Sequence, residues 1–287
     1  MPRVSVVVPH YNDLAGLDRC LTALAAQTHD DYEVVVADNG SALPPGELEQ
    51  VVGGRAHLVV IREKGAGPAR NGGVAASRGD ILAFIDSDCV AERDWLAAGE
   101  RALGSYDFVG GRVKVLVGDQ SRMSAAEAFE AVFAFDFESY ITRKGFTGSG
   151  NMFVLRAVFD RVGGFRKSVS EDVEWSQRAR ALGCRLGYAS DAVVAHPARC
   201  TWLDLLQKWQ RTNREMYLLA REQPRGRLSW ALRMAAVPAS AVVHSGKVLG
   251  HRDLPDARAR ALALLTLHRL RWWRMADGLR LLVRDGR

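Results

Sequence analysis

The sequence contains few cysteines, and their spacing matches no metal or redox motif. Four cysteines stand far apart in the 287 residues, at Cys20, Cys89, Cys184 and Cys200. No two of them have the CxxC spacing of a zinc knuckle or of a dithiol motif, which excludes both kinds of site. Free thiols are typical of a reducing compartment, so we expect a cytoplasmic protein.

Long hydrophobic runs are also missing. The apolar stretch at residues 4–8 is short, and it ends at Pro9 without the small residues of a cleavage site. We therefore expect a first β-strand there rather than a signal peptide. Residues 228–249 are mostly apolar, but Arg233, Pro238, His244 and Lys247 interrupt them. A membrane-spanning helix needs about 20 mostly apolar residues, so none is predicted.

Charge of both signs is present but unevenly distributed. Hydrophobic residues make up 48% of the chain and charged residues 25%, which is the composition of a globular protein. Residues 1–198 contain 21 basic and 26 acidic side chains, whereas residues 199–287 contain 18 basic and seven acidic ones, a net charge of +11. This excess favours contact with an anionic membrane or with nucleic acid, although a solvated helical face would also explain it.

Strands and helices alternate over the first part of the chain. Short apolar runs rich in β-branched residues predict strands, and helical spacing of leucine or alanine predicts helices between them. Strands are expected at residues 4–8, 33–37, 58–61 and 81–85, and helices at residues 14–26, 68–77 and 91–103. This alternation predicts a mainly parallel, doubly wound sheet that binds its ligand beyond the carboxyl ends of the strands.

The pattern changes after residue 105 to an α+β continuation. A strand is expected at residues 108–117, a helical stretch at 123–141, a glycine-rich loop at 145–150, a short apolar run at 151–155, a helix at 171–182, and extended pieces at 185–189 and 192–195. Only helices are expected from Thr201 onward. Residues 262–283 interleave leucine and tryptophan, including Trp272 and Trp273, with arginine, as an interfacial amphipathic helix does.

Two aspartates follow the fourth expected strand. Asp86 and Asp88 are two residues apart in FIDSDC, so in an extended backbone their side chains point the same way. Paired carboxylates suit Mg²⁺ or Mn²⁺, whose remaining ligands are often phosphate oxygens. A helix cap or a turn would use the same residues. Asp38 ends the second strand at the same edge of the sheet, which favours a shared crevice.

Several motifs, in this order, resemble those of the family 2 glycosyltransferases, which have the GT-A fold. The resemblance covers roughly residues 3–196, and it is specific as a set rather than motif by motif. The segments are VSVVVPHYN, EVVVADNGS, GPARNGGVAASRGDILAFIDSDC, GSGNMFVLRAVFDRVGGF and EDVEWSQRA. The fold implied is a Rossmann-like α/β domain with a mixed, mainly parallel sheet, flanking helices and here a helical C-terminal extension.

The resemblance implies roles on the nucleotide side. Asp38 matches the acid that reads the nucleobase, usually uracil, while Asn39 stands where many relatives have a second aspartate. Pro9 and Tyr11 match the loop that packs on the base. Arg70 and Asn71 match a segment that contacts the diphosphate or the base. Asp88 is expected to bind the metal ion, and Asp86 the ion or the ribose. A turn acid at Asp38 and a packing role for the ARN segment are the alternative interpretations.

The acceptor side is implied in the same way. Asp172 matches the general base that takes a proton from the acceptor hydroxyl, with Glu171 as the second choice, although helix capping also explains an acid there. His196 matches a late histidine that binds the metal or diphosphate, but a histidine before proline is often structural. Gly148, Ser149 and Asn151 match a loop near the donor sugar and acceptor, and a simple turn into a strand is the alternative.

The function implied is inverting transfer of a sugar from a nucleotide sugar, favouring a UDP-sugar, to a glycan or lipid-linked acceptor, with Mn²⁺ or Mg²⁺. A sugar nucleotidyltransferase would also use paired acids, but the turn PHYND lacks its glycine-rich phosphate loop. A non-catalytic nucleic-acid-binding protein would use only the basic tail, so no nucleic acid partner is expected.

The domain organisation expected from these motifs has two parts. Residues 1–198 form the GT-A catalytic domain, with a nucleotide-binding half at 1–105 and an acceptor-side half at 106–198. Residues 199–287 form a basic helical region. Its charge suggests attachment to an anionic membrane surface, on the inner face of the cell membrane.

Overall fold

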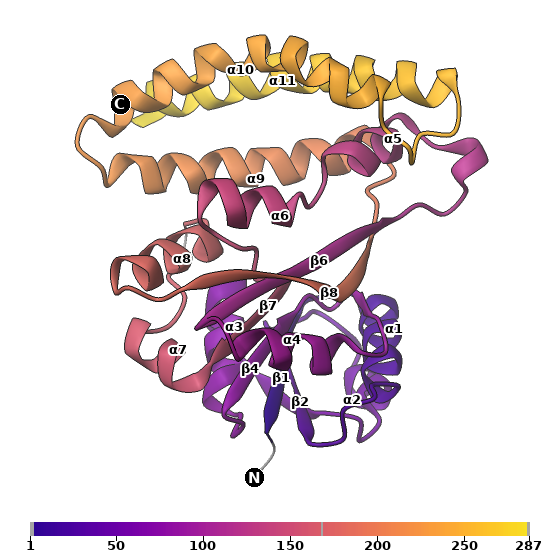
Figure 1. Cartoon of the computed structure of the whole chain (residues 1–287), viewed down its shortest axis with the longest axis vertical. Helices are drawn as coiled ribbons and strands as arrows, with labels where there is room; N and C mark the ends of the chain where they lie inside the picture. Colours follow the sequence, from indigo (N-terminus) through magenta and orange to yellow (C-terminus); the bar gives the residue numbers. More distant parts are fainter. Residues whose placement is uncertain (1–2, 168, 286–287) are drawn as a thin grey trace. The chain divides into compact units, whose positions relative to one another are not determined.

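The computed structural model describes residues 3–167 and 169–285, which form two compact units (Figure 1). The first unit comprises the described residues of Met1–Lys114, Asp136–Lys167 and Glu171–His196. The second comprises those of Val115–Phe135, Ser168–Ser170 and Pro197–Arg287. Each unit has its own hydrophobic core.

In the described part of the chain, eight strands form one sheet, in the order β3-β2-β1-β4-β7-β6-β8-β5. Strands β1, β2, β3 and β4 are parallel, whereas β7 is antiparallel to β4 and to β6. The strands are β1 (Val4–His10), β2 (Tyr32–Asp38), β3 (His57–Val60), β4 (Ile81–Ile85), β5 (Val90–Ala91), β6 (Phe108–Leu116), β7 (Asn151–Leu155) and β8 (Leu186–Pro197). The mixed, mainly parallel sheet predicted from the sequence is confirmed.

Helices cover both faces of the sheet, and this explains the apolar runs in its strands. In β1, Val6 and Val8 pack on one face, whereas Val7 packs on the other. The first face is covered by α1 (Leu14–Ala25), α2 (Glu47–Val52) and α4 (Trp95–Leu103), and the second by α3 (Ala66–Ala75), α7 (Arg156–Val162) and α8 (Glu171–Ala181). Successive side chains of a strand point to opposite faces, so a strand buried on both sides is apolar throughout.

The largest differences between expected and observed elements lie in three parts of the chain. The helix expected at 91–103 begins only at Trp95, because Val90 and Ala91 pair as β5 with β8. The extended pieces at 185–189 and 192–195 are one strand, β8. The helical stretch at 123–141 is interrupted: α5 (Ala125–Phe133) ends before an extended Ala134 and a Phe135 with φ of 58°. Helical structure resumes as α6 (Phe137–Ser139), followed by a π-helical turn at Tyr140–Lys144.

The second unit consists mainly of helices, as expected for residues after Thr201. Besides α5 it contains α9 (Trp202–Arg221), α10 (Gly226–Leu249) and α11 (Ala257–Asp285). Thr201 and Asp204 form a capping box that starts α9. Leu205 is fully buried at this end of α9, whereas Leu203 is 61% exposed. Among the described residues, no helix is long and apolar enough to span a bilayer.

Candidate active site

The carboxyl ends of three neighbouring strands hold several of the residues singled out on the nucleotide side. Strand β1 lies between β2 and β4, and it ends at His10. Asp38 is the last residue of β2, and Asp86 directly follows β4. The carboxyl ends of parallel strands lie at the same edge of a sheet, so His10, Asp38 and Asp86 lie at the ends of adjacent strands.

The carboxylate of Asp38 is buried and accepts four hydrogen bonds. One oxygen, Oδ1, accepts from His10 Nδ1 at 2.9 Å and from the Ser41 hydroxyl at 2.5 Å. The other, Oδ2, accepts from the backbone N–H groups of Gly40 and Ser41 at 3.1 and 3.0 Å. Burial raises the pKa of Asp38, but the hydrogen bonds from Ser41 and His10 outweigh it and lower the pKa below its usual range.

The tautomer of His10 follows from its second contact. Its Nε2 accepts a hydrogen bond from the backbone N–H of Asp13 at 3.2 Å. A neutral imidazole with an accepting Nε2 has its proton on Nδ1, and this nitrogen faces Asp38. His10 therefore joins the end of β1 to the end of β2, a role that its place between Pro9 and Tyr11 did not reveal in the sequence.

Tyr11 directly follows His10 and is 57% exposed, whereas Pro9, near the end of β1, is half-buried. The ammonium group of Lys64 lies 5.0 Å from the centre of the Tyr11 ring, and it donates to the carbonyl oxygens of Asn39 and Gly40. The pairing of Tyr11 and Lys64 offers an aromatic face with a nearby positive charge. Lys64 was not singled out from the sequence, because it lies just before the recognised GPARN motif.

The side chain of Asn39 is engaged within the protein. Its amide nitrogen donates to the carbonyl oxygens of Ile61 and Glu63, and its oxygen accepts from the N–H of Gly65. These contacts hold the chain between β3 and α3. An aspartate in this position would have no N–H to donate, so these contacts require the amide of Asn39.

Arg70 links two acids that are far apart in the sequence. Its guanidinium donates to Asp86 Oδ1 at 2.6 Å and to Glu171 Oε1 at 2.9 Å. The Arg70 side chain is 5% exposed, Glu171 18% and Asp86 37%. Burial lowers the pKa of Arg70, but the charges of Asp86 and Glu171 outweigh this effect and raise it. Arg70 therefore stays charged and connects the donor-side acid to the start of α8.

Two amides that were expected to contact substrate make internal hydrogen bonds. Asn71 donates to the carbonyl oxygen of Phe165 and accepts from its N–H, both at 2.8 Å. Asn151 is fully buried, and its oxygen accepts from the indole N–H of Trp95 at 2.9 Å. Its amide nitrogen donates to the carbonyl oxygens of Arg112 and Ala192. Both residues hold the framework of the site, and their contacts with substrate stay predictions.

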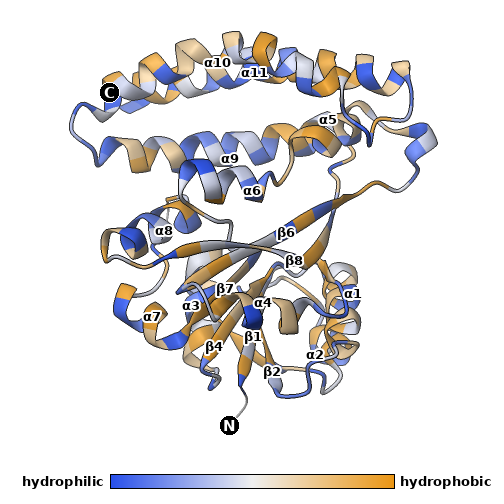
Figure 2. Ribbon diagram, in the orientation of Figure 1, coloured by the Kyte–Doolittle hydropathy of each residue, from blue (hydrophilic) through white to orange (hydrophobic). Residues whose placement is uncertain are grey.

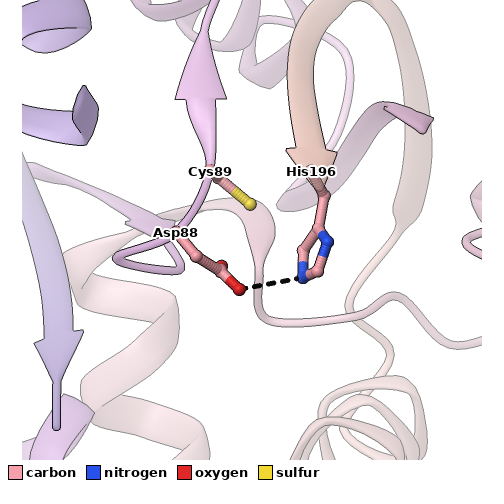
Figure 3. A group of neighbouring side chains, drawn as sticks. All are labelled: Asp88, Cys89 and His196. Carbon is pink, nitrogen blue, oxygen red and sulfur yellow. Dashed lines mark ion pairs between the residues drawn. The ribbon is translucent and has the colours of Figure 1, made fainter. Parts of the chain in front are cut away.

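Asp88 and His196 face each other across the pairing of β5 with β8 (Figure 3). His196 Nε2 lies 3.3 Å from Asp88 Oδ2. The Asp88 side chain is 34% exposed and that of His196 is 8% exposed. One atom each of Asp88, Cys89 and His196 lies within 4.8 Å of the others, so this is a possible metal site.

Two of these three side chains are suitable ligands for Mn²⁺ or Mg²⁺. A carboxylate oxygen is the ligand that both ions prefer, and Mn²⁺ also accepts a neutral imidazole. The sulfur of Cys89 is a soft ligand, which suits Zn²⁺ or Cu⁺ better than the hard ions Mg²⁺ and Mn²⁺. Asp88 and His196 are therefore the residues that could hold the ion. Asp86 Oδ1 is ion-paired with Arg70, and binding of the ion by Asp86 stays a prediction.

The glycine-rich loop at residues 145–150 leads into β7 and lies against Asp86. A Cβ atom added to Gly150 would lie 2.5 Å from Asp86 Oδ2, so only glycine lets the loop approach this closely. Ser149 and Gly148 are buried, and Gly148 packs against the ring of Phe137. The loop thus lies against Asp86 on one side and against α6 on the other.

The N-terminus of α8 contributes the acceptor-side acids. Glu171, Asp172 and Glu174 all lie in its first turn, where the helix dipole stabilises negative charge. Asp172 is half-buried, and its Oδ1 accepts from the N–H of Val173 at 2.7 Å. The charge of Asp172 also raises the pKa of Arg70. Asp172 therefore belongs to the same charged cluster as Asp86 and Glu171.

Comparison with known proteins identifies relatives of this chain. Residues 5–163 match the family model described as Glycosyl transferase family 2. Glycosyltransferase AglE of Haloferax volcanii is 32% identical over 209 residues, covering 69% of this chain and 68% of its own length. The pre-mycofactocin glycosyltransferase of Mycobacterium tuberculosis is 31% identical over 225 residues, covering 71% of this chain but only 45% of its own length.

Solved structures share the fold at low sequence identity. The mannosyltransferase PcManGT from Pyrobaculum calidifontis, in complex with GDP-Man and Mn²⁺, has a TM-score of 0.60 at 19% identity, over 97% of this chain and 87% of its own. S. aureus TarS 1–349 in complex with UDP has a TM-score of 0.53 at 19% identity, over 100% of this chain and 92% of that fragment. Both likenesses concern the fold, including the helices that follow the sheet.

Proposed function

Because this chain belongs to glycosyl transferase family 2, whose members transfer sugar from a nucleotide sugar, we propose that it is a metal-dependent inverting transferase. The donor is a UDP-sugar and the acceptor is a hydroxyl of a glycan or lipid-linked molecule, in the biosynthesis of a polysaccharide or glycoconjugate. The observation that carries the proposal is the pair Asp88 and His196 beside the cluster of Asp86, Arg70 and Glu171. Family membership gives no support to a nucleotidyltransferase or to a nucleic-acid-binding protein.

On the donor side, Asp88 and His196 would hold Mn²⁺ or Mg²⁺. When bound, the ion neutralises charge on the diphosphate as it leaves. PcManGT binds GDP-Man together with Mn²⁺, which supports a metal-dependent reaction here, whereas TarS binds UDP. Asp86, ion-paired with Arg70, would face the ribose.

The nucleobase would lie beside Tyr11 and Asp38. The Asp38 carboxylate already accepts four hydrogen bonds, so a base N–H must replace one of their donors. The Ser41 hydroxyl is the donor that rotates most freely, because the other three are two backbone amides and a buried imidazole. His10 would keep the carboxylate in place during this exchange.

On the acceptor side, Asp172 would act as general base. It accepts the proton of the acceptor hydroxyl while that oxygen forms its bond to the anomeric carbon and the bond to the nucleoside diphosphate breaks. Attack from the face opposite the leaving group inverts the anomeric configuration. Glu171 is held by Arg70, so Asp172 is the better placed of the two acids. Gly148 and Ser149 would line the acceptor and sugar.

The basic residues 199–287 would bring the enzyme to its acceptor. Their net charge of +11 favours an anionic membrane surface, where a lipid-linked acceptor would lie. The catalytic residues 1–198 would then work at the inner face of the cell membrane as a peripheral protein.

A donor screen tests the proposal directly. Purified protein is incubated with UDP-, GDP- and dTDP-sugars, with and without Mn²⁺, and release of the nucleoside diphosphate is measured. We expect one nucleotide class to be hydrolysed or transferred, and Mn²⁺ to be required. Turnover in the presence of a metal chelator would contradict the role of Asp88 and His196, and release from GDP-sugars alone would contradict the UDP assignment.

A further inference from the structure

The second unit exposes an apolar surface on a helix other than the one that the sequence favoured for membrane contact. Residues 262–283 of α11 form the amphipathic stretch, but Ala263, Leu267 and Leu270 are buried in the core of the unit. Trp273 packs against the same core, while Trp272 is exposed. Most of the apolar face of α11 therefore stabilises the helical unit itself.

Helix α10, by contrast, has apolar residues on both faces. One face is buried through Trp230, Met234, Val237, Ala241 and Val248. The opposite face forms what we call the outer stripe, which consists of the exposed residues Leu228, Leu232, Ala235, Ala236, Ala239, Val242, Val243, Gly246 and Leu249. Their spacing of three and four residues keeps them on one side of the helix. Figure 2 shows hydrophobic turns along the middle of α10.

The exposure of this stripe is high for large apolar side chains. Val243 is 78% exposed, Val242 70%, Leu232 64% and Leu228 58%. No charged residue belongs to the stripe. A continuous apolar surface on an otherwise charged unit indicates a docking site, because isolated exposed residues would be the ordinary case.

The charges around the stripe indicate what covers it. Between Glu222 and Asp253 the chain has five basic residues and no acidic one. Arg225 precedes α10, Arg252 follows it, and both are exposed. An apolar helix face with basic residues at its two ends suits the boundary between headgroups and acyl chains of an anionic bilayer.

A second copy of the chain suits the same surface poorly. In a two-fold pairing of the stripes, the helices run antiparallel or parallel, and either arrangement brings basic ends of one α10 beside basic ends of the other. Like charges in contact oppose such pairing, whereas anionic lipids neutralise them.

We propose that the outer stripe of α10 is the surface that docks on an anionic lipid bilayer, with Val242 and Val243 inserted among the acyl chains and Arg225 and Arg252 at the headgroups. This inference extends the membrane contact proposed above, and it does not depend on the sugar chemistry. Helix α10 would lie in the plane of the interface rather than cross it, in agreement with the lack of a spanning helix among the described residues.

Vesicle flotation tests the assignment. The full chain is mixed with vesicles of phosphatidylcholine and phosphatidylglycerol, or of phosphatidylcholine alone, and the bound fraction is measured. We expect binding to the anionic vesicles only. Val242→Ser with Val243→Ser should weaken it by about tenfold or more, from the lost transfer of two apolar side chains. Arg225→Gln and Arg252→Gln should each weaken it by roughly fivefold at low salt.

A matched control separates the stripe from general hydrophobicity. Leu265 lies on α11 and is 70% exposed, so Leu265→Ser removes a comparable side chain outside the stripe. We expect this variant to bind as the unmodified protein does. Equal losses for Leu265→Ser and for the double valine variant would overturn the assignment to α10, as would failure of the unmodified protein to bind anionic vesicles.

Two further measurements distinguish lipid docking from dimer formation and from loss of the transferase fold. Sedimentation velocity shows whether the double valine variant changes the oligomeric state, and conversion of a dimer to a monomer would mean that a second copy covers the stripe. Release of nucleoside diphosphate without vesicles should be unchanged in this variant, with circular dichroism confirming its fold. If vesicle binding follows the predictions but no nucleotide sugar is turned over, the proposed function fails and the docking surface stands.

Discussion

His196 Nε2 lies 3.3 Å from the carboxylate of Asp88, and the register between β5 and β8 sets that distance. Val90 pairs with Ala195, so the residues next to this pair, Cys89 and His196, are neighbours across the two strands. Asp88 lies directly before Cys89, on the loop that connects β4 to β5. A very short strand thus brings together two possible metal ligands from distant parts of the chain.

Replacing His196 should weaken metal binding. We expect His196→Ala to lower the affinity for Mn²⁺ by about tenfold or more, since loss of even an outer partner of a metal site typically costs about 10- to 100-fold. Isothermal titration with Mn²⁺ measures this directly. The control is His57→Ala, because His57 is an exposed histidine on β3. Unchanged Mn²⁺ affinity in His196→Ala would exclude His196 as a ligand.

Removing the proposed general base should stop transfer while leaving the protein folded. We expect Asp172→Asn to reduce kcat by about 10²- to 10⁴-fold, the usual contribution of a positioned acid or base. Donor affinity should change little, because the proton transfer involves the acceptor. Asp160→Asn, at an exposed position on α7, is the matched control. Full turnover by Asp172→Asn would contradict the assignment and leave Glu171 as the candidate.

Loss of the Arg70 guanidinium should destabilise the first unit. Arg70→Met leaves Asp86 and Glu171 without their shared partner, and we expect a loss of about 1–3 kcal/mol, less than for a fully buried pair because Asp86 is partly exposed. Urea unfolding followed by fluorescence measures this change. Arg93→Met, at an exposed position, should unfold at the same urea concentration as the unmodified chain. Equal stability of Arg70→Met and the unmodified chain would show that the cluster does not support the fold.

The lowered pKa of Asp38 predicts a pH dependence of stability. A carboxyl whose pKa is lower in the folded than in the unfolded chain stabilises the fold above its unfolded pKa, about 3.9. This stabilisation is lost as the pH falls through the lower folded pKa. Asp38→Asn should therefore be less stable than the unmodified protein at neutral pH, and the difference should shrink in acid. Melting temperatures measured from neutral pH down to pH of about 3 test this; a constant difference would contradict the prediction.

Strands β1, β2 and β4 and helix α1 were predictable because their signals are local. The apolar runs of β1, β2 and β4 and the spacing of Leu17, Leu21 and Leu24 in α1 reflect burial on the two faces of one sheet. The break after Phe133 was not predictable, because α5 ends in a backbone conformation at Phe135 that no glycine or proline announces. The interruptions in residues 228–249 argue against a membrane-spanning helix, but they do not reveal how the apolar residues of α10 divide between two faces.

The sequence by itself determined the fold class, the family and the identity of the polar residues at the strand ends, because each of these depends on periodicity or on a short motif. Only the tertiary structure decided which of those residues meet. Arg70 pairs with Asp86 and Glu171, His10 with Asp38, and Asp88 with His196, and each contact joins separate elements through strand order and helix packing. Such contacts are long-range, and no local pattern specifies them.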